Sequence, residues 1–156
     1  MAELAPVKMR QTGDGSQTLF HPELEVCYHS VHGAWTETQH VLGDMGVEAA
    51  WARKAEGSIH ILEVGLGTGL NVLDVWGRAK ASGRHVVMVS LEPHPLTWPE
   101  VEPLGHDQWV AESRPLLEAA HVHGAWSDAH MTFERRLSGV LEAPLEAVSY
   151  THLRAH

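Results

Sequence analysis

The sequence predicts an α/β fold of the Rossmann-like kind, in which an incomplete parallel sheet follows an N-terminal extension of strands and loops. Three observations lead to this prediction. A β-branched and apolar run, Ile59–Val64, is followed by a glycine-rich turn. Apolar residues then recur at helical spacing over residues 70–76. A second apolar run, residues 85–92, is typical of a strand buried on both faces of a parallel sheet.

The N-terminal extension, residues 1–57, is expected to lie as a cap beside the glycine-rich turn. Residues 1–20 contain the Asp-Gly pair of a hairpin turn and predict a strand or hairpin, with a loose arm as the alternative. Residues 36–42 fit either a short strand or the start of a helix. We expect Gly43–Gly46 to interrupt the chain before a short helix over residues 47–54.

The elements after the second predicted strand continue the βαβ order of a parallel sheet. Thr97 and Glu100 have the spacing of a capping box at the start of a helix. Residues 121–126 are expected to form a loop, and the alternation over residues 131–135 predicts the third strand. Residues 145–148 would open a fourth strand.

The glycine-rich turn favours a nucleoside ligand over a simple bend. Gly65 and Gly67 lack a Cβ, so the backbone can approach a ligand closely. Gly69 comes one residue earlier than in the dinucleotide fingerprint. Glu63, at the tip of the preceding strand, would repel a pyrophosphate and attract a cationic amino-acid end. The pattern therefore favours S-adenosylmethionine over NAD, and a glycine-rich turn without a ligand is the alternative.

Glu92 closes the second predicted strand, about 20 residues beyond the turn. In nucleoside-binding crossover folds, an acid at this place accepts hydrogen bonds from ribose hydroxyls. We therefore predict that Glu92 binds ribose; the alternative is a strand-end acid that only faces water.

Composition limits the classes of function. The net charge of −9 is unfavourable for nucleic-acid contact by this segment alone, since phosphate contacts require Lys and Arg. The single cysteine, Cys27, excludes an internal disulfide framework and fits a reducing cytosol. No apolar run approaches the length of a membrane span, and the N-terminus lacks the apolar core of a signal peptide. We expect a cytoplasmic chain with no membrane contact.

Thirteen histidines raise the question of a metal site. The closest pairs, His29 with His32 and His121 with His123, have no third ligand at a suitable spacing. No metal is therefore expected.

Three segments in order are similar to the motifs of one family. They read YHSVHGAWTETQHVL, LEVGLGTGLNVLDVW and VSLEPHPLTWPEVEPL, and together they cover roughly residues 21–104. The chain resembles the MnmC-type methyltransferase domain, which methylates the amine of 5-aminomethyl-2-thiouridine at the tRNA wobble position. The resemblance implies a Rossmann-like class I methyltransferase with S-adenosylmethionine as cofactor and tRNA as partner of the full-length enzyme. It also implies a flavin oxidoreductase domain in the same chain or a partner in the same pathway.

The resemblance assigns roles to individual residues. Two residues of the upstream motif, Glu37 and Thr38, fall on the substrate-side cap, and Glu92 falls on the ribose. The positions around the methionine part of S-adenosylmethionine are Glu63, Gly65, Gly67, Thr68, Gly69 and Asn71.

Two parts of the family pattern are missing. Residues 136–140 lack the acid that usually follows strand three, and no D-x-F-x-P-like segment follows to hold the target amine. The catalytic residue therefore stays unknown, and we expect a C-terminally truncated chain without activity.

The sequence accordingly divides into three segments. Residues 1–57 form the extension, residues 58–148 a partial S-adenosylmethionine-binding methyltransferase domain, and residues 149–156 a tail that resembles translated adapter DNA and is expected to be non-native. Without strands four and five of a 3-2-1-4-5 sheet, the strand Ile59–Val64 is expected to be an open edge. A nicotinamide- or flavin-dependent oxidoreductase fragment and a non-catalytic truncated binding module are the alternative functions.

Overall fold

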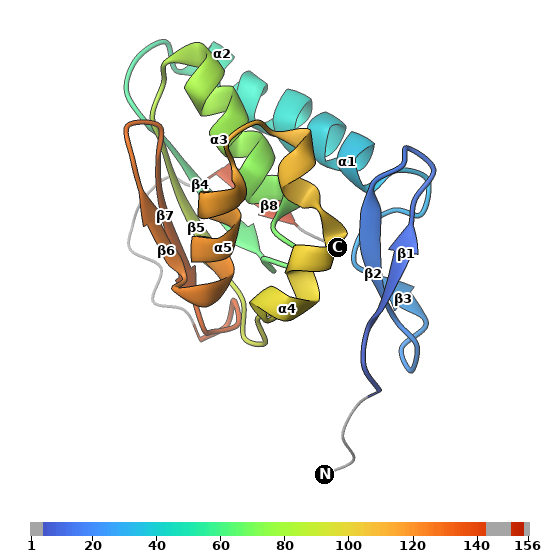
Figure 1. Ribbon diagram of the computed structural model, residues 1–156. Helices are drawn as coiled ribbons and strands as arrows, with labels where there is room; N and C mark the ends of the chain where they lie inside the picture. Colours follow the sequence, from blue (N-terminus) through green and yellow to red (C-terminus); the bar gives the residue numbers. More distant parts are fainter. Residues whose placement is uncertain (1–4, 143–150, 155–156) are drawn as a thin grey trace.

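The computed structural model describes residues 5–142 and 151–154, and it confirms the predicted α/β architecture (Figure 1). A five-stranded sheet has the order β6-β7-β5-β4-β8, and a three-stranded sheet, β1-β2-β3, stands apart from it. The strands β4 (Ile59–Val64), β5 (Val86–Leu91) and β7 (Met131–Arg136) are parallel neighbours. The predicted order of the first three strands is therefore observed.

The register of β4 and β5 brings their carboxyl ends to one edge of the sheet. Glu63 of β4 is the Cα partner of Ser90 of β5, and Val64 is the partner of Leu91. The glycine-rich turn and Glu92 leave the sheet directly after these pairs. Ligands of open parallel sheets bind at this edge.

The prediction that β4 is the outermost strand of the sheet, with one side unpaired, is wrong. The strand β8 (Thr151–Arg154) pairs with it in parallel over Ile61–Val64, so β4 has a neighbour on both sides. The predicted strand over residues 145–148 lies outside the described residues. The prediction that residues 149–156 are non-native concerns the origin of these residues, and it stays a prediction.

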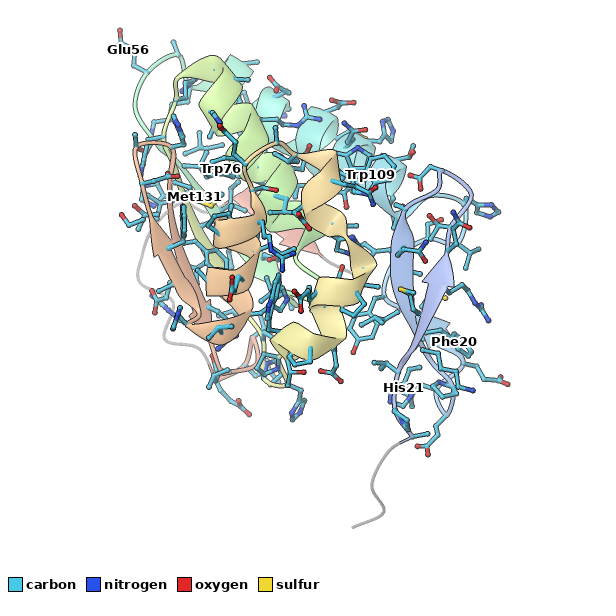
Figure 2. The ribbon with its side chains drawn as sticks, in the orientation of Figure 1. Phe20, His21, Glu56, Trp76, Trp109 and Met131 are labelled. Carbon is cyan, nitrogen blue, oxygen red and sulfur yellow. The ribbon has the colours of Figure 1, made fainter. Side chains whose placement is uncertain are left out.

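Most of the described helices pack on one face of the sheet. The helices α3 (Leu70–Ser82) and α5 (Arg114–Val122) lie against it, with α4 (Trp98–Val101) beside them (Figure 1). Trp76 of α3 and Met131 of β7, labelled in Figure 2, belong to the same buried core. Further members of the same core, each with no more than 1% of its surface exposed, are Val47, Ile61, Val72, Leu73, Val75, Ala79, Val86, Met88, Val101, Leu104, Leu116, Leu117 and Ala120.

In the described part of the chain, no helix combines the length and the apolar character that crossing a membrane requires.

The capping box predicted at the start of α4 is confirmed. Glu100 accepts hydrogen bonds from the backbone N–H of Thr97, at 2.8 Å, and from its hydroxyl, at 2.9 Å. Two short 3₁₀ turns, η2 (Glu102–Leu104) and η3 (His106–Trp109), then lead to α5.

The loop predicted over residues 121–126 is wrong. The helix α5 continues to Val122, and β6 (Ala125–Ser127) pairs with β7 in the antiparallel sense. Arg135 of β7 donates hydrogen bonds to the carbonyls of Ala120 (3.1 Å) and His121 (2.6 Å). These carbonyls at the end of a helix would otherwise be unsatisfied, so the capping by Arg135 extends the helix.

The hairpin predicted near the N-terminus is confirmed as β1 (Lys8–Gln11) and β2 (Gln17–His21), and β3 (Val26–Cys27) adds a third strand. Asp14 in the hairpin turn accepts a hydrogen bond at 2.8 Å from the backbone N–H of Thr36, in the first turn of the next helix. Burial acts to raise the pKa of Asp14, but hydrogen bonds from Ser16 and Thr36 outweigh it and hold that pKa well below its ordinary value. The hairpin is thus tied to the helix that follows it.

The chain from residue 34 to residue 53 is one continuous helical stretch, so the interruption predicted at Gly43–Gly46 is wrong. It consists of α1 (Ala34–Glu37), the π-helix η1 (Thr38–Glu48) and α2 (Ala49–Arg53). A π-helix of this length is rare and needs support from its surroundings.

Arg78 of α3 supplies this support. Its Nη2 donates to the carbonyl of Gln39 at 3.2 Å, inside the widened helix. Its Nη1 lies 3.1 Å from Asp44 and 3.2 Å from Glu48, and its Nε donates to Asp74 at 2.9 Å. The π-helix therefore depends on a tertiary contact that local helix propensity does not reveal.

Gly43→Ala is expected to destabilise the chain by about 1 kcal/mol, although alanine is the better helix former by about that amount. A Cβ at residue 43 would overlap the guanidinium of Arg78 and displace it from its partners. Urea unfolding of both single variants and the double variant with Arg78→Ala measures the effect. In the Arg78→Ala background, Gly43→Ala should stabilise; a loss of the same size in both backgrounds would contradict this account.

Candidate functional site

The turn between β4 and α3 is built on left-handed glycines. Gly65 and Gly69 both have φ of 87°, and Gly67 has φ of 54°. The N–H of Gly65 donates to the carbonyl of Leu91 at 2.8 Å, and the N–H of Gly69 donates to that of Leu66 at 3.1 Å. The chain thereby reverses within a few residues and begins α3 at the edge of the sheet.

Gly69 is also constrained from outside. A Cβ at this position would lie 2.7 Å from Cδ1 of Leu117 and 2.9 Å from Cε1 of His121. The helix α5, which carries both side chains, therefore packs directly against the turn. The sequence shows a glycine here, but only the fold shows what a larger residue would meet.

Glu92 follows β5 and lies against the glycine turn, and its predicted binding of ribose stays a prediction. Its Oε2 accepts hydrogen bonds from the backbone N–H groups of Leu66 (3.1 Å) and Gly67 (3.4 Å). Its Oε1 accepts one from the N–H of His94 at 2.9 Å. The acid that follows β5 is thus positioned against the backbone that follows β4.

Glu63 is fully buried beneath the same turn. Its Oε1 accepts a hydrogen bond from Nδ2 of Asn71 at 2.9 Å, and its Oε2 accepts one from the hydroxyl of Ser90. Burial raises the pKa of Glu63 to about 7; the bonds from Ser90 and Asn71 oppose the rise, and the charge of Glu92 adds to it. Two of the predicted site residues, Glu63 and Asn71, are therefore in direct contact, and the charge of Glu92 is close enough to raise the pKa of Glu63.

The other predicted site residues have different surroundings. Thr68 is fully buried, and its hydroxyl has no hydrogen-bond partner among the described residues. Glu37 accepts a hydrogen bond at 2.8 Å from the backbone N–H of Ser30, so it stabilises the loop that follows Tyr28. Thr38 is buried at the start of η1.

Three residues near the turn were not predicted as site residues. Ser90 hydrogen-bonds Glu63, and a parallel register with Glu63 opposite Ser90 could have revealed it. The ring of Tyr28 lies 3.5 Å from the place of a Cβ on Gly67; burial raises its pKa, as do the charges of Glu92 and Glu100. The third is His121, whose approach depends on the packing of α5 and had no signal in the sequence.

Three histidines near these residues have lowered pKa values; His106 and His121 are buried and His29 is partly buried. Burial lowers the pKa of His29 to about 4 and that of His106 to about 3, and it lowers the pKa of His121. Among residues 5–142 and 151–154, no three side chains of histidine, cysteine or acid type are grouped as a metal site would need.

Comparison with known proteins identifies relatives of this chain. No family model matches it. It is 30% identical to the tRNA 5-methylaminomethyl-2-thiouridine biosynthesis bifunctional protein MnmC of Cupriavidus metallidurans. This match extends over 130 residues, which are 81% of this chain and 18% of that protein. MnmC proteins of Methylibium petroleiphilum and Thiobacillus denitrificans are 36% and 38% identical over 100 and 105 residues, covering 62% and 64% of this chain.

A solved structure agrees with these relatives. The crystal structure of MNMC2 from Aquifex aeolicus matches the fold with a TM-score of 0.76 at 21% identity, over 99% of this chain and 50% of that one. The resemblance to the MnmC family is thereby confirmed, and so is the Rossmann-like fold. The chain spans less than a fifth of the length of these three curated relatives and half of the solved chain.

Proposed function

We propose that this chain binds S-adenosylmethionine at the glycine turn and forms the cofactor-binding part of a methyltransferase for the tRNA wobble uridine. The observation that carries the proposal is the placement of two acids on one turn. Glu92 lies on the turn amides, and Glu63 lies beneath them with Asn71 and Ser90. The printed name of the relatives, a tRNA 5-methylaminomethyl-2-thiouridine biosynthesis protein, supports the choice of substrate.

The residues present suit a sulfonium nucleoside better than a dinucleotide. The amides of Leu66 and Gly67 are engaged by the carboxylate of Glu92, and a pyrophosphate placed there would be repelled by it. Ribose hydroxyls, in contrast, can donate hydrogen bonds to the same carboxylate. Glu63, once ionised, would attract the amino group of the methionine part.

S-adenosylmethionine would supply a methyl group on a positively charged sulfur. Glu92 would hold the ribose, and Glu63 with Asn71 would orient the methionine end. The acceptor would be the neutral amine of 5-aminomethyl-2-thiouridine, which attacks the methyl directly and needs chiefly correct positioning. Glu37 and Thr38 would belong to the acceptor side of the site.

The proposal extends to the surroundings of the enzyme. The tRNA would be bound by the full-length protein, since the charge of this chain is −9. The reaction would take place in the cytoplasm. A flavin oxidoreductase domain or partner would act in the same modification pathway.

Glu92→Ala should weaken the binding of S-adenosylmethionine by about 10- to 100-fold, because hydrogen bonds to a charged group contribute about 1.5–3 kcal/mol. Titration calorimetry with S-adenosylmethionine, and with NAD as a comparison ligand, measures this. Glu118→Ala, an exposed acid on α5, is the matched control and should bind like the unaltered chain. Equal affinity in Glu92→Ala would remove Glu92 from the site, and binding of NAD without S-adenosylmethionine would contradict the proposal.

A further inference from the structure

His121 contacts the glycine turn from the side of α5. Its Nε2 lies 3.3 Å from the carbonyl oxygen of Gly67, and its Cε1 is one of the atoms that a Cβ on Gly69 would meet. The side chain is 5% exposed. A buried imidazole therefore meets the backbone of the turn at two successive glycines.

The hydrogen-bonding state of the ring follows from its two neighbours. Its Nδ1 lies 3.0 Å from the carbonyl of Leu117, which is four residues earlier in α5. An α-helix already directs the backbone N–H of residue 121 to that carbonyl. The carbonyl of Gly67 lies in the turn, outside any helix or strand. A neutral imidazole has a single N–H, which can be donated to only one of these two carbonyls. Because the Leu117 carbonyl already has a helical donor, the N–H is of more use on Nε2, and the unprotonated Nδ1 then faces the Leu117 carbonyl.

The position of His121 is itself fixed by the sheet. Arg135 of β7 donates hydrogen bonds to the carbonyls of Ala120 and His121, which hold the last turn of α5 in place. The strand β7, the end of α5 and the turn are thus connected through polar contacts.

Glu92 and His121 hold opposite polar groups of the same residue. Glu92 accepts a hydrogen bond from the N–H of Gly67, whereas Nε2 of His121 lies 3.3 Å from the carbonyl oxygen of the same residue. A ligand whose ribose hydroxyls bind Glu92 would compete for the carboxylate that now engages the turn amides. The contact from His121 does not involve Glu92 and would persist.

We propose that His121 is a positioning residue for the nucleoside site: its Nε2–H holds the carbonyl of Gly67, so that the glycine turn keeps its shape when Glu92 engages ribose. The inference rests on the proposed function for the identity of the ligand. The hold on the turn itself is a property of the ligand-free chain. It can therefore be measured without any ligand.

Three variants test the inference. His121→Leu removes the donor and keeps a side chain of similar bulk, His121→Gln restores an N–H donor near the place of Nε2, and His123→Leu changes an exposed neighbouring histidine as the control. Amide hydrogen exchange of residues 66–69, followed by NMR without ligand, should become about tenfold faster in His121→Leu, as expected for the loss of one hydrogen bond. Exchange in His121→Gln and His123→Leu should stay within about threefold of the unaltered chain.

The unaltered chain gives a second measurement, which holds even if a variant fails to fold. The inference predicts an observable, slowly exchanging Nε2–H resonance of His121 with a nuclear Overhauser contact to the turn. A rapidly exchanging ring proton, or unchanged exchange of residues 66–69 in His121→Leu, would overturn it.

Titration with S-adenosylmethionine separates the inference from the proposed function. We expect about tenfold weaker binding in His121→Leu and recovery in His121→Gln. Equal affinity in the unaltered chain and His121→Leu would overturn the inference. Absence of binding by the unaltered chain would contradict the proposed function, while the exchange of the turn amides would still decide the role of His121.

Discussion

Gly69→Ala is expected to destabilise the chain by about 3 kcal/mol. The residue has φ of 87°, where any L side chain is strained by about 1–2 kcal/mol. Its Cβ would also overlap Leu117 and His121, and overpacking of this kind costs about 1–3 kcal/mol. Urea unfolding at constant pH measures the loss, with the slope of the transition showing whether the native state stays compact.

Gly83→Ala is the matched control for this substitution. Gly83 also has a left-handed backbone, with φ of 68° at the end of α3, but a Cβ there would meet no atom within 4 Å. Its substitution should cost only the backbone strain, about 1 kcal/mol. Equal losses at both positions would show that α5 does not press on the turn as the structure indicates.

Glu63→Gln is expected to remove a pH dependence of stability of about 3 kcal/mol. Burial raises the pKa of Glu63 from 4.5 to about 7, so between these values the folded chain binds a proton that the unfolded chain has released. The contribution of this group to the free energy of unfolding therefore falls as the pH rises from about 4.5 to about 7, and is level above that. The difference between the two pKa values corresponds to about 3 kcal/mol.

Urea unfolding of the unaltered chain and Glu63→Gln between pH 4 and pH 8 tests this expectation. Asp74, whose pKa burial raises to about 6, titrates in the same interval but is present in both proteins and cancels from their difference. Glu56→Gln is the control. Glu56 is exposed, and it lies at the upper left of Figure 2, far from the turn. A difference between the unaltered chain and Glu63→Gln that stays constant over this pH range would show that Glu63 is not buried beneath the turn.

The same substitution bears on the ligand. The side-chain amide that Glu63→Gln introduces can still form hydrogen bonds with Asn71 and Ser90, but it carries no charge to attract the amino group of S-adenosylmethionine. Under the proposed function, Glu63→Gln should be more stable than the unaltered chain above pH 7 and should bind S-adenosylmethionine more weakly. This combination is typical of sites in which a buried charge is kept for binding.

The amino-acid sequence is sufficient to predict the elements whose cause is local. The strand Ile59–Val64, the glycine turn, the helix that starts at Leu70 and the capping box of Thr97 and Glu100 were all predicted, because periodicity, glycine conformation and capping act within a few residues. The position of Glu92 at the end of the second strand was also predicted. Its contact with the turn agrees with that position, since the carboxyl ends of adjacent parallel strands lie side by side.

The features that depend on distant side chains became visible only in the folded chain. The helix through Gly43–Gly46 exists because Arg78 of another helix supports it, and α5 continues to Val122 because Arg135 caps it from a strand. The approach of His121 to Gly67 joins residues that are 54 positions apart. Hydrogen bonds of this kind are set by the packing of whole elements, and no local propensity encodes them.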